Sequence, residues 1–286
     1  MGLVFPASPV PKTKLKKGLG ILEAFNFSIL KCEVSLTEKG YLAGTDDERL
    51  EGLMAAFRSP ETQGVLAARG GFGCLRLLPR IDWATLPKNK PMIGFSDVTA
   101  LHMSRLAHTG EGGWHAPVVS SYTYFEPNRR EETVMALQGR GPDNWAFAKR
   151  EVLREGLARG PLMGGNLTLI NSLLGTGHLP SFKGAILMIE DVDEQNYRLD
   201  RQLTVLWLSG KLKDIAGLVF GEFVNCGFRD NVKKLLAAFA RECLPDVPAV
   251  RGAPFGHGKI NSPWWYGEEA ELAAGPGQAG LTFLER

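Results

Sequence analysis

The stretch Pro91-Met92-Ile93-Gly94-Phe95-Ser96-Asp97-Val98-Thr99-Ala100 decides the fold class, because it joins a short apolar run to the first turn of a helix. Residues 91–95 read as a buried strand, and residues 97–108 read as a helix with Val98 and Leu101 facing inward. The serine between them suits two roles. It is either a helix N-cap, a position that serine often fills, or a nucleophile that needs a base from elsewhere in the chain. The local sequence leaves both roles open.

The same alternation of strand and helix continues on both sides of this stretch. Short apolar runs at 64–68, 185–189, 215–220 and 247–250 indicate strands, and amphipathic periodicity at 46–57, 199–207 and 232–243 indicates helices. The segment 126–160 is polar and poorly periodic, which is typical of a linker or an elaborated surface region. We therefore predict an α/β protein with an N-terminal parallel-sheet domain (1–125), a linker region (126–160) and a smaller C-terminal α/β domain with a mixed sheet (161–286).

Composition excludes several classes of protein. The 286 residues are 44% apolar and 22% charged, as in a soluble globular protein, and the net charge is only +2. Charges of both signs are scattered, and the one basic run (Lys12, Lys14, Lys16 and Lys17) reads as a solvated loop, so nucleic acid is not expected as a partner. No apolar stretch approaches the roughly 20 residues of a membrane span. Near the start, the positive charges follow the apolar residues, the reverse of a secretory signal.

The cysteines and histidines give no metal-site pattern. Cys32, Cys74, Cys226 and Cys243 are far apart and form no CxxC, so neither a zinc site nor a disulfide framework is indicated. No histidine pair has the zincin spacing. We expect a reduced, cytoplasmic protein that needs neither a metal nor another cofactor and has no membrane partner.

Candidate reactive residues cluster where predicted strands end, which is where ligands bind in open α/β sheets. They are Gly70-Gly71, Ser96-Asp97, Glu190 and His257. A serine hydroxyl needs a base that is held in one tautomer by a third group, and a histidine and a carboxylate supply these functions. The order Ser, acid, His matches α/β-hydrolases, although residues 94–98 lack the second glycine of G-x-S-x-G.

Each candidate also has a structural interpretation. Glu190 begins the acidic run 190–194, which also suits a solvated loop or a helix start, and a Gly-Gly pair suits any tight turn. His257 lies between two glycines, and on local grounds a structural role is as plausible as a catalytic one. His115 ranks below it as a residue lining the site.

Six motifs in order resemble the serine LD-carboxypeptidase family, which includes murein tetrapeptide carboxypeptidases and microcin C immunity peptidases. They are GYLAGTD (40–46), ARGGFG (68–73), GFSDVTALH (94–102), GGNL (164–167), IEDVDE with YR (189–194 and 197–198) and PFGHG (254–258). The resemblance implies a triad of Ser96, Glu190 and His257, with the serine at a nucleophile elbow and the acid and base in the C-terminal domain. It also implies an oxyanion hole formed by the backbone N–H groups of Asp97 and, less directly, Gly71.

The sequence departs from the family pattern in two places. Residues 4–9 replace the usual Pro-Gly-Asp opening and suggest a shortened first strand and loop, and Phe72 stands where a tyrosine is usual. Neither departure touches the three triad positions.

The family resemblance leaves the substrate open. We expect a small peptide or muropeptide that loses a terminal D-alanine. The alternative is a peptidyl or aminoacyl nucleotide, on whose base Trp145 could stack, although packing is the ordinary role of a lone tryptophan. A non-catalytic muropeptide-binding protein is a third interpretation, and a homodimer is an expectation from the family alone.

Overall fold

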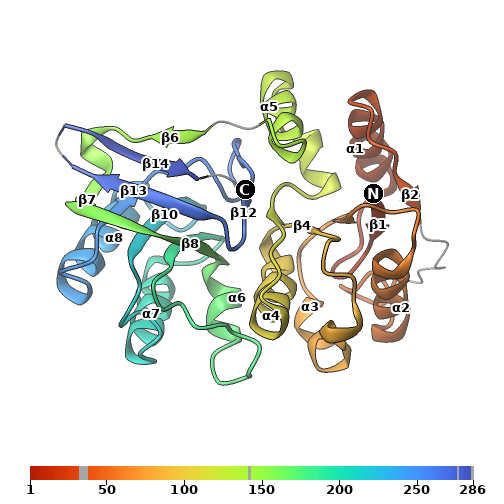
Figure 1. Ribbon diagram of the computed structural model, residues 1–286, viewed down its shortest axis with the longest axis horizontal. Coiled ribbons are helices and arrows are strands. Elements are labelled where there is room, and N and C mark those ends of the chain that lie inside the picture. The colour runs from red at the N-terminus through yellow and green to blue at the C-terminus, as the bar shows by residue number, and fades with distance from the viewer. Residues whose placement is uncertain (32–37, 141–142, 276, 285–286) are drawn as a thin grey trace. The chain divides into compact units, whose positions relative to one another are not determined.

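The computed structural model describes residues 1–31, 38–140, 143–275 and 277–284 (Figure 1). The chain forms two compact units, each with its own sheet. Unit 1 comprises Met1–Gly141 and Ser262–Trp265, and unit 2 comprises Pro142–Asn261 and Tyr266–Arg286. Within the described ranges, no helix has the length and apolar character that crossing a membrane requires.

Unit 1 contains the predicted parallel sheet. Its six strands lie in the order β12 (Trp264–Trp265), β5 (Trp114–His115), β4 (Met92–Gly94), β3 (Val65–Ala67), β1 (Gly2–Val4) and β2 (Leu30–Lys31). Every neighbouring pair is parallel except β12 and β5, which are antiparallel. Strands β1, β3 and β4 are buried along their whole length, as expected when helices cover both faces of a parallel sheet.

Local sequence accounts for the helices of unit 1. The α-helices are α1 (Lys12–Ala24), α2 (Asp46–Arg58), α3 (Cys74–Leu77), α4 (Thr99–Thr109) and α5 (Pro127–Leu137), and the 3₁₀ turns are η1 (Leu78–Arg80), η2 (Trp83–Thr85), η3 (Ser96–Val98) and η4 (Val119–Thr123). Helix α2 begins with a capping box: Thr45 Oγ1 accepts the Glu48 N–H at 3.2 Å, and Glu48 Oε2 accepts the Thr45 N–H at 2.7 Å. The basic run at residues 12–17 begins helix α1, so its interpretation as a loop is wrong, since lysine is a good helix former.

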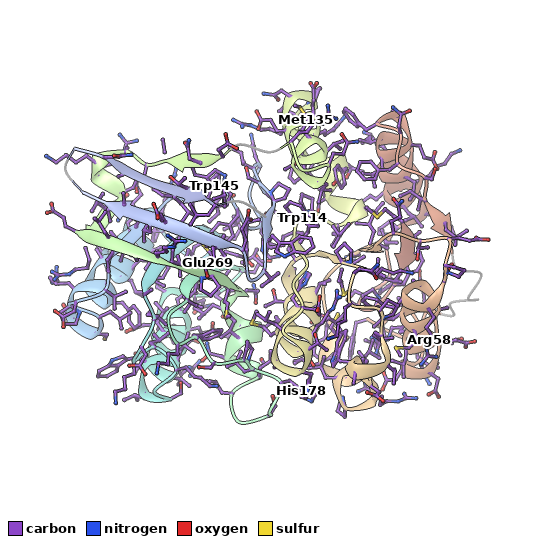
Figure 2. The ribbon with its side chains drawn as sticks, in the orientation of Figure 1. Arg58, Trp114, Met135, Trp145, His178 and Glu269 are labelled. Atoms are coloured by element: carbon purple, nitrogen blue, oxygen red, sulfur yellow. The ribbon has the colours of Figure 1, made fainter. Side chains whose placement is uncertain are left out.

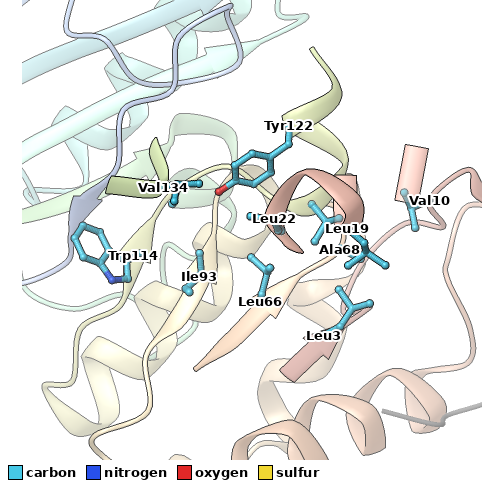
Figure 3. Close-up of a cluster of buried hydrophobic side chains, with 12 residues drawn as sticks. Leu3, Val10, Leu19, Leu22, Leu66, Ala68, Ile93, Trp114, Tyr122 and Val134 are labelled. Atoms are coloured by element: carbon cyan, nitrogen blue, oxygen red, sulfur yellow. The ribbon is translucent and has the colours of Figure 1, made fainter. Parts of the chain in front are cut away.

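A continuous apolar core supports the sheet of unit 1 (Figure 3). Side chains from the strands, from α1, α5 and η4, and from the connecting loops pack together in it. The buried members are Leu3, Val10, Leu19, Leu22, Leu66, Ala68, Ile93, Trp114, Ala116, Val119, Tyr122 and Val134. This packing gives the loops at the ends of the strands a rigid base.

Unit 2 contains the predicted mixed sheet. Its eight strands lie in the order β6 (Asn144–Ala146), β14 (Ala279–Phe283), β13 (Glu269–Ala274), β8 (Gly156–Asn166), β9 (Ile186–Val192), β10 (Gly217–Val224), β11 (Ala249–Arg251) and β7 (Val152–Arg154). The four strands from β8 to β11 are parallel, and the flanking pairs are antiparallel.

The helices of unit 2 are α6 (Leu167–Ser172), α7 (Asn196–Leu208) and α8 (Arg229–Cys243), with the 3₁₀ turn η5 (Lys149–Glu151). Helix α7 buries Leu199, Leu203 and Leu206 as predicted. Trp207, at the end of the predicted amphipathic segment 199–207, is 41% exposed. Each residue turns an α-helix by about 100°, so Trp207 lies about 40° beyond Leu203, at the edge of the buried stripe rather than within it.

The segment 126–160 is more regular than its composition suggests, because it contains α5 in unit 1 and β6, η5, β7 and the start of β8 in unit 2. Residues 262–265 supply β12 to the sheet of unit 1, a pairing that no local pattern predicts. Cys74, Cys226 and Cys243 are free thiols, and Cys32 lies outside the described residues.

Candidate active site

Ser96 is held in a strained turn between β4 and α4. Its φ is +63°, in the left-handed region that costs a residue with a side chain about 1–2 kcal/mol. It does not fill the N-cap position, because the N-cap residues of η3 and α4 are Phe95 and Val98. A strained serine between a strand and a helix has the geometry of a nucleophile elbow, which favours the nucleophile over the cap.

Two glycines make room for this turn. A Cβ placed on Gly94 would lie 2.9 Å from Val98 Cγ1, so the chain folds back tightly only because position 94 has no side chain. A Cβ placed on Gly70 would lie 2.9 Å from Ser96 Cβ and 3.1 Å from Ser96 Oγ. The backbone of the Gly-Gly turn is therefore packed directly against the serine.

Ser8 fixes the Gly-Gly turn, a role that the sequence did not reveal. The Ser8 N–H donates to the Gly70 carbonyl at 3.3 Å, and Ser8 Oγ accepts the Phe72 N–H at 3.1 Å. Gly71 has φ +111°, and a Cβ there would lie 2.4 Å from Ser8 Oγ. The only signal for Ser8 was its place in the loop after the first strand.

The Asp97 side chain is engaged away from Ser96. It is 1% exposed, and Oδ2 accepts the Cys74 N–H at 2.8 Å at the start of α3. Burial raises the pKa of this carboxyl, against the effect of the Cys74 hydrogen bonds. The carboxylate is occupied by its hydrogen bond at the start of α3. Asp97 is therefore expected to contribute to the site through its backbone N–H group.

Two of the three histidines of unit 1 are buried. His102 Nε2 lies 3.1 Å from the Gly94 carbonyl, and burial lowers the pKa of this imidazole to about 3, so it stays neutral beneath the turn. His115 is fully buried and stacks on Trp264 with ring centroids 4.9 Å apart. His108 is exposed on α4. The burial of His115 against Trp264 gives no support to the prediction that His115 lines a site.

Unit 2 brings Glu190 and His257 together. His257 Nδ1 lies 2.7 Å from Glu190 Oε2. Glu190 is a completely buried residue within β9, paired with Asn166 of β8, so its interpretation as part of a solvated loop is wrong. Burial disfavours the charged imidazolium, but Glu190 and the neighbouring acids outweigh it, and the pKa of His257 lies above its ordinary value of 6.5.

Asp191 is a second buried acid, and its hydrogen bonds organise the ends of β8 and β9. It accepts the Asn166 side-chain amide at 2.9 Å, the Thr168 N–H and hydroxyl at 3.0 and 2.9 Å, and the Val192 N–H at 2.8 Å. Burial and the charge of Glu190 raise the pKa of Asp191 to about 6. These bonds fix the start of α6 and the backbone that follows Glu190, so Asp191 supports the strand that carries Glu190.

Trp145 lies among the strands of unit 2 (Figure 2). It is 6% exposed, stacks on Phe255 with centroids 6.1 Å apart, and meets Phe283 edge-on at 5.0 Å. A ring enclosed in this way packs the core, and its surface is not free to stack on a nucleobase.

The predicted site residues are divided between the units. Ser96, Asp97 and Gly71 belong to unit 1, and Glu190 and His257 belong to unit 2. Across the described part of the chain, no group of three or more His, Cys, Asp or Glu side chains could hold a metal ion.

Comparison with known proteins identifies the family. Residues 1–116 match the LD-carboxypeptidase N-terminal domain, and residues 159–272 match the LD-carboxypeptidase C-terminal domain. A murein tetrapeptide carboxypeptidase from Pseudomonas aeruginosa is 32% identical over 95% of this chain and 92% of its own.

Solved structures agree with this assignment. The muramoyltetrapeptide carboxypeptidase of Oxalobacter formigenes is 29% identical, with a TM-score of 0.85 over 100% of this chain and 99% of its own. The microcin C7 self-immunity protein MccF, solved in complex with aspartyl sulfamoyl adenosine, has a TM-score of 0.86 over 100% of this chain and 95% of its own, but at 20% identity it shows the fold alone. The chain belongs to the LD-carboxypeptidase family.

Proposed function

We propose that this protein is a serine carboxypeptidase that hydrolyses an L,D peptide bond and releases the C-terminal D-alanine of murein tetrapeptide. The observation that carries the proposal is the 2.7 Å contact between His257 Nδ1 and Glu190 Oε2. A buried carboxylate that holds one ring nitrogen leaves Nε2 as the proton acceptor, which is the arrangement that a serine nucleophile requires. The murein tetrapeptide carboxypeptidase relative supports the choice of substrate.

In the proposed reaction, Ser96 Oγ attacks the carbonyl carbon of the scissile bond while His257 Nε2 takes the hydroxyl proton. Glu190 stabilises the resulting imidazolium, which then gives the proton to the leaving D-alanine amine. Water, activated by the same histidine, hydrolyses the acyl-enzyme and regenerates the serine. The oxyanion is assigned to the N–H groups of Asp97 and Gly71, each worth roughly 10²- to 10³-fold in comparable enzymes.

The nucleophile is tested by Ser96→Ala, with release of D-alanine from purified tetrapeptide followed by mass spectrometry. We expect turnover to fall by about 10⁴-fold or more. Ser181→Ala, at an exposed serine of unit 2, is the matched control and should retain full turnover. A Ser96→Ala enzyme within a few-fold of the parent would remove Ser96 from the mechanism.

The substrate is tested separately from the nucleophile. Turnover of murein tetrapeptide is compared with turnover of an aminoacyl sulfamoyl-adenosine, and preference for the nucleotide would make the chain a microcin-type immunity peptidase. The packing of Trp145 removes the feature that favoured this alternative. Labelling of Ser96 by a serine-directed phosphonate supports an enzyme. Binding of muropeptide without labelling or turnover would instead indicate a sensor.

The proposed substrate indicates where in the cell the enzyme acts. We propose that the enzyme acts in the cytoplasm, as a homodimer, on muropeptides recovered during peptidoglycan recycling. Loss of the enzyme should cause tetrapeptides to accumulate in the cytoplasmic fraction, and sedimentation equilibrium measures the oligomeric state.

A further inference from the structure

Glu222 of β10 holds the loop that carries His257 from both sides. Its backbone N–H donates to the Phe255 carbonyl at 2.9 Å, two residues before the histidine. Its side-chain carboxylate packs against Gly258, the residue after the histidine, so closely that a Cβ there would lie 1.6 Å from Glu222 Oε2 and 2.6 Å from Oε1. Glu222 therefore contacts the His257 loop on each side of the imidazole, through a backbone hydrogen bond to Phe255 and through the packing of its carboxylate against Gly258.

The glycines of the loop show how closely it is packed. A Cβ on Gly258 would lie 1.6 Å from Glu222 Oε2, so only glycine fits beside this carboxylate. A Cβ on Gly256 would lie 3.1 Å from Glu190 Oε2 and 3.2 Å from the Glu222 carbonyl. The loop backbone thus runs between Glu190 on β9 and Glu222 on β10.

The charges around the imidazole come from three elements. Glu190 and Asp191 lie on β9, Asp193 follows it, and all three raise the pKa of His257 against the effect of burial. Glu222 on β10 and His257 also interact. Burial and the charge of Glu190 raise the pKa of Glu222, while the Gly258 N–H, Arg229 of α8 and His257 act in the opposite direction.

We propose that Glu222 is a positioning residue for catalysis: its carboxylate fixes the loop that presents His257 and stabilises the imidazolium that forms when the nucleophile is deprotonated. The proposal rests on the proposed function, because it assigns His257 the role of general base. Glu190 orients the ring through Nδ1, and Glu222 orients the backbone that carries the ring. Glu222 acts through His257 and is not expected to touch the substrate.

The test uses the full-length protein with two changes at this position. Glu222→Gln keeps an oxygen that can accept the Gly258 N–H but removes the charge, whereas Glu222→Ala removes both. Glu242→Gln, at an exposed position in the last turn of α8, is the control for loss of one negative charge. The readouts are the pKa of His257, measured by NMR of ¹³C-labelled histidine and assigned with His257→Asn, and the pH dependence of kcat/KM.

We expect Glu222→Gln to lower the pKa of His257 by about 0.5–1 unit, since a nearby carboxylate favours the imidazolium. Glu222→Ala should lower the pKa of His257 in the same way and also reduce kcat by about tenfold. KM should stay within twofold of the parent value, because the loop loses a supporting contact but the substrate loses none. Glu242→Gln should change neither quantity.

An unchanged pKa of His257 in a folded Glu222→Gln protein would overturn the proposal and leave Glu222 a purely structural residue. A large rise in KM with unchanged kcat would also overturn it, because Glu222 would then bind substrate. The NMR titration needs no substrate. A shifted pKa in a protein that releases no D-alanine would therefore refute the proposed function while supporting the coupling of Glu222 to His257.

Discussion

The candidate site residues of the two units are held in place in different ways. In unit 1 their arrangement depends on backbone shape: Ser96 has φ +63°, Gly71 has φ +111°, and a side chain at position 70 would collide with Ser96. In unit 2 it depends on buried charge, because Glu190 is fully buried and its Oε2 lies 2.7 Å from His257 Nδ1. The first group should therefore respond to changes in side-chain size, and the second to changes in charge and pH.

The largest expected effect tests the charged group. Glu190→Gln keeps the size of the side chain but removes the charge that stabilises the imidazolium, and the corresponding change in a serine protease lowers kcat by about 10⁴. We expect a similar fall in D-alanine release, together with a lower pKa of His257 in an NMR titration. The melting curve by circular dichroism should remain cooperative. Unchanged turnover would transfer the acid role to Asp191 or Glu194.

A smaller effect tests the group built from backbone. The methyl of Gly70→Ala would meet Ser96 Cβ at 2.9 Å, so the turn must shift, and we expect kcat to fall by about 10²- to 10³-fold, the size of losing one oxyanion donor. The pKa seen in the pH profile should not change, because no charge is altered. The matched control is Gly20→Ala in α1, where an added Cβ meets nothing within 4 Å and should be neutral or slightly stabilising. Full activity of Gly70→Ala would show that the close contact is not required.

The smallest effect is the pH dependence of the unmodified enzyme. His257 accepts a proton only when it is neutral, and its pKa lies above 6.5, so kcat/KM should rise with pH through a value above 6.5. Below that pKa, activity should fall about tenfold per pH unit, because the neutral fraction falls tenfold. Stopped assays of D-alanine release between pH 5 and about 9 measure the curve. An acid limb centred well below 6.5 would mean that another group is the base.

Local pattern was enough to predict the regular elements with strong periodicity. Helix α2 and strands β3, β4 and β9 were found where the apolar spacing placed them, because burial on one or both faces leaves a direct record in the sequence. The α/β class and the mixed second sheet followed from their order. The segment Gly156–Asn166 was divided between the linker and the second domain, because its glycines and proline are untypical of a strand, yet it forms the central strand β8.

The parts that sequence could not supply depend on long-range contacts. Ser8 acts on the turn at residues 70–72, and Glu222 acts on a loop some 35 residues later, so neither has a local signature. Glu190 lies in an acidic run that favours solvent, and it is buried only because β8 and β10 flank β9 and His257 supplies a partner. The ends of predicted strands indicated Ser96, Glu190 and His257 as candidates, the family resemblance implied that they form a triad, and their three roles remain predictions.

Strand β12 limits how the chain can be divided into separate fragments. It pairs with β5, and its Trp264 covers His115, although it lies about 150 residues further along the chain. A fragment that stops after α5 would contain Ser96 and nearly all of unit 1, but it would leave β5 as an open edge and strip the cover from a buried ring. We expect such a fragment to aggregate unless residues 262–265 are added to it. The unit that carries Ser96 therefore needs residues 262–265 to complete its sheet.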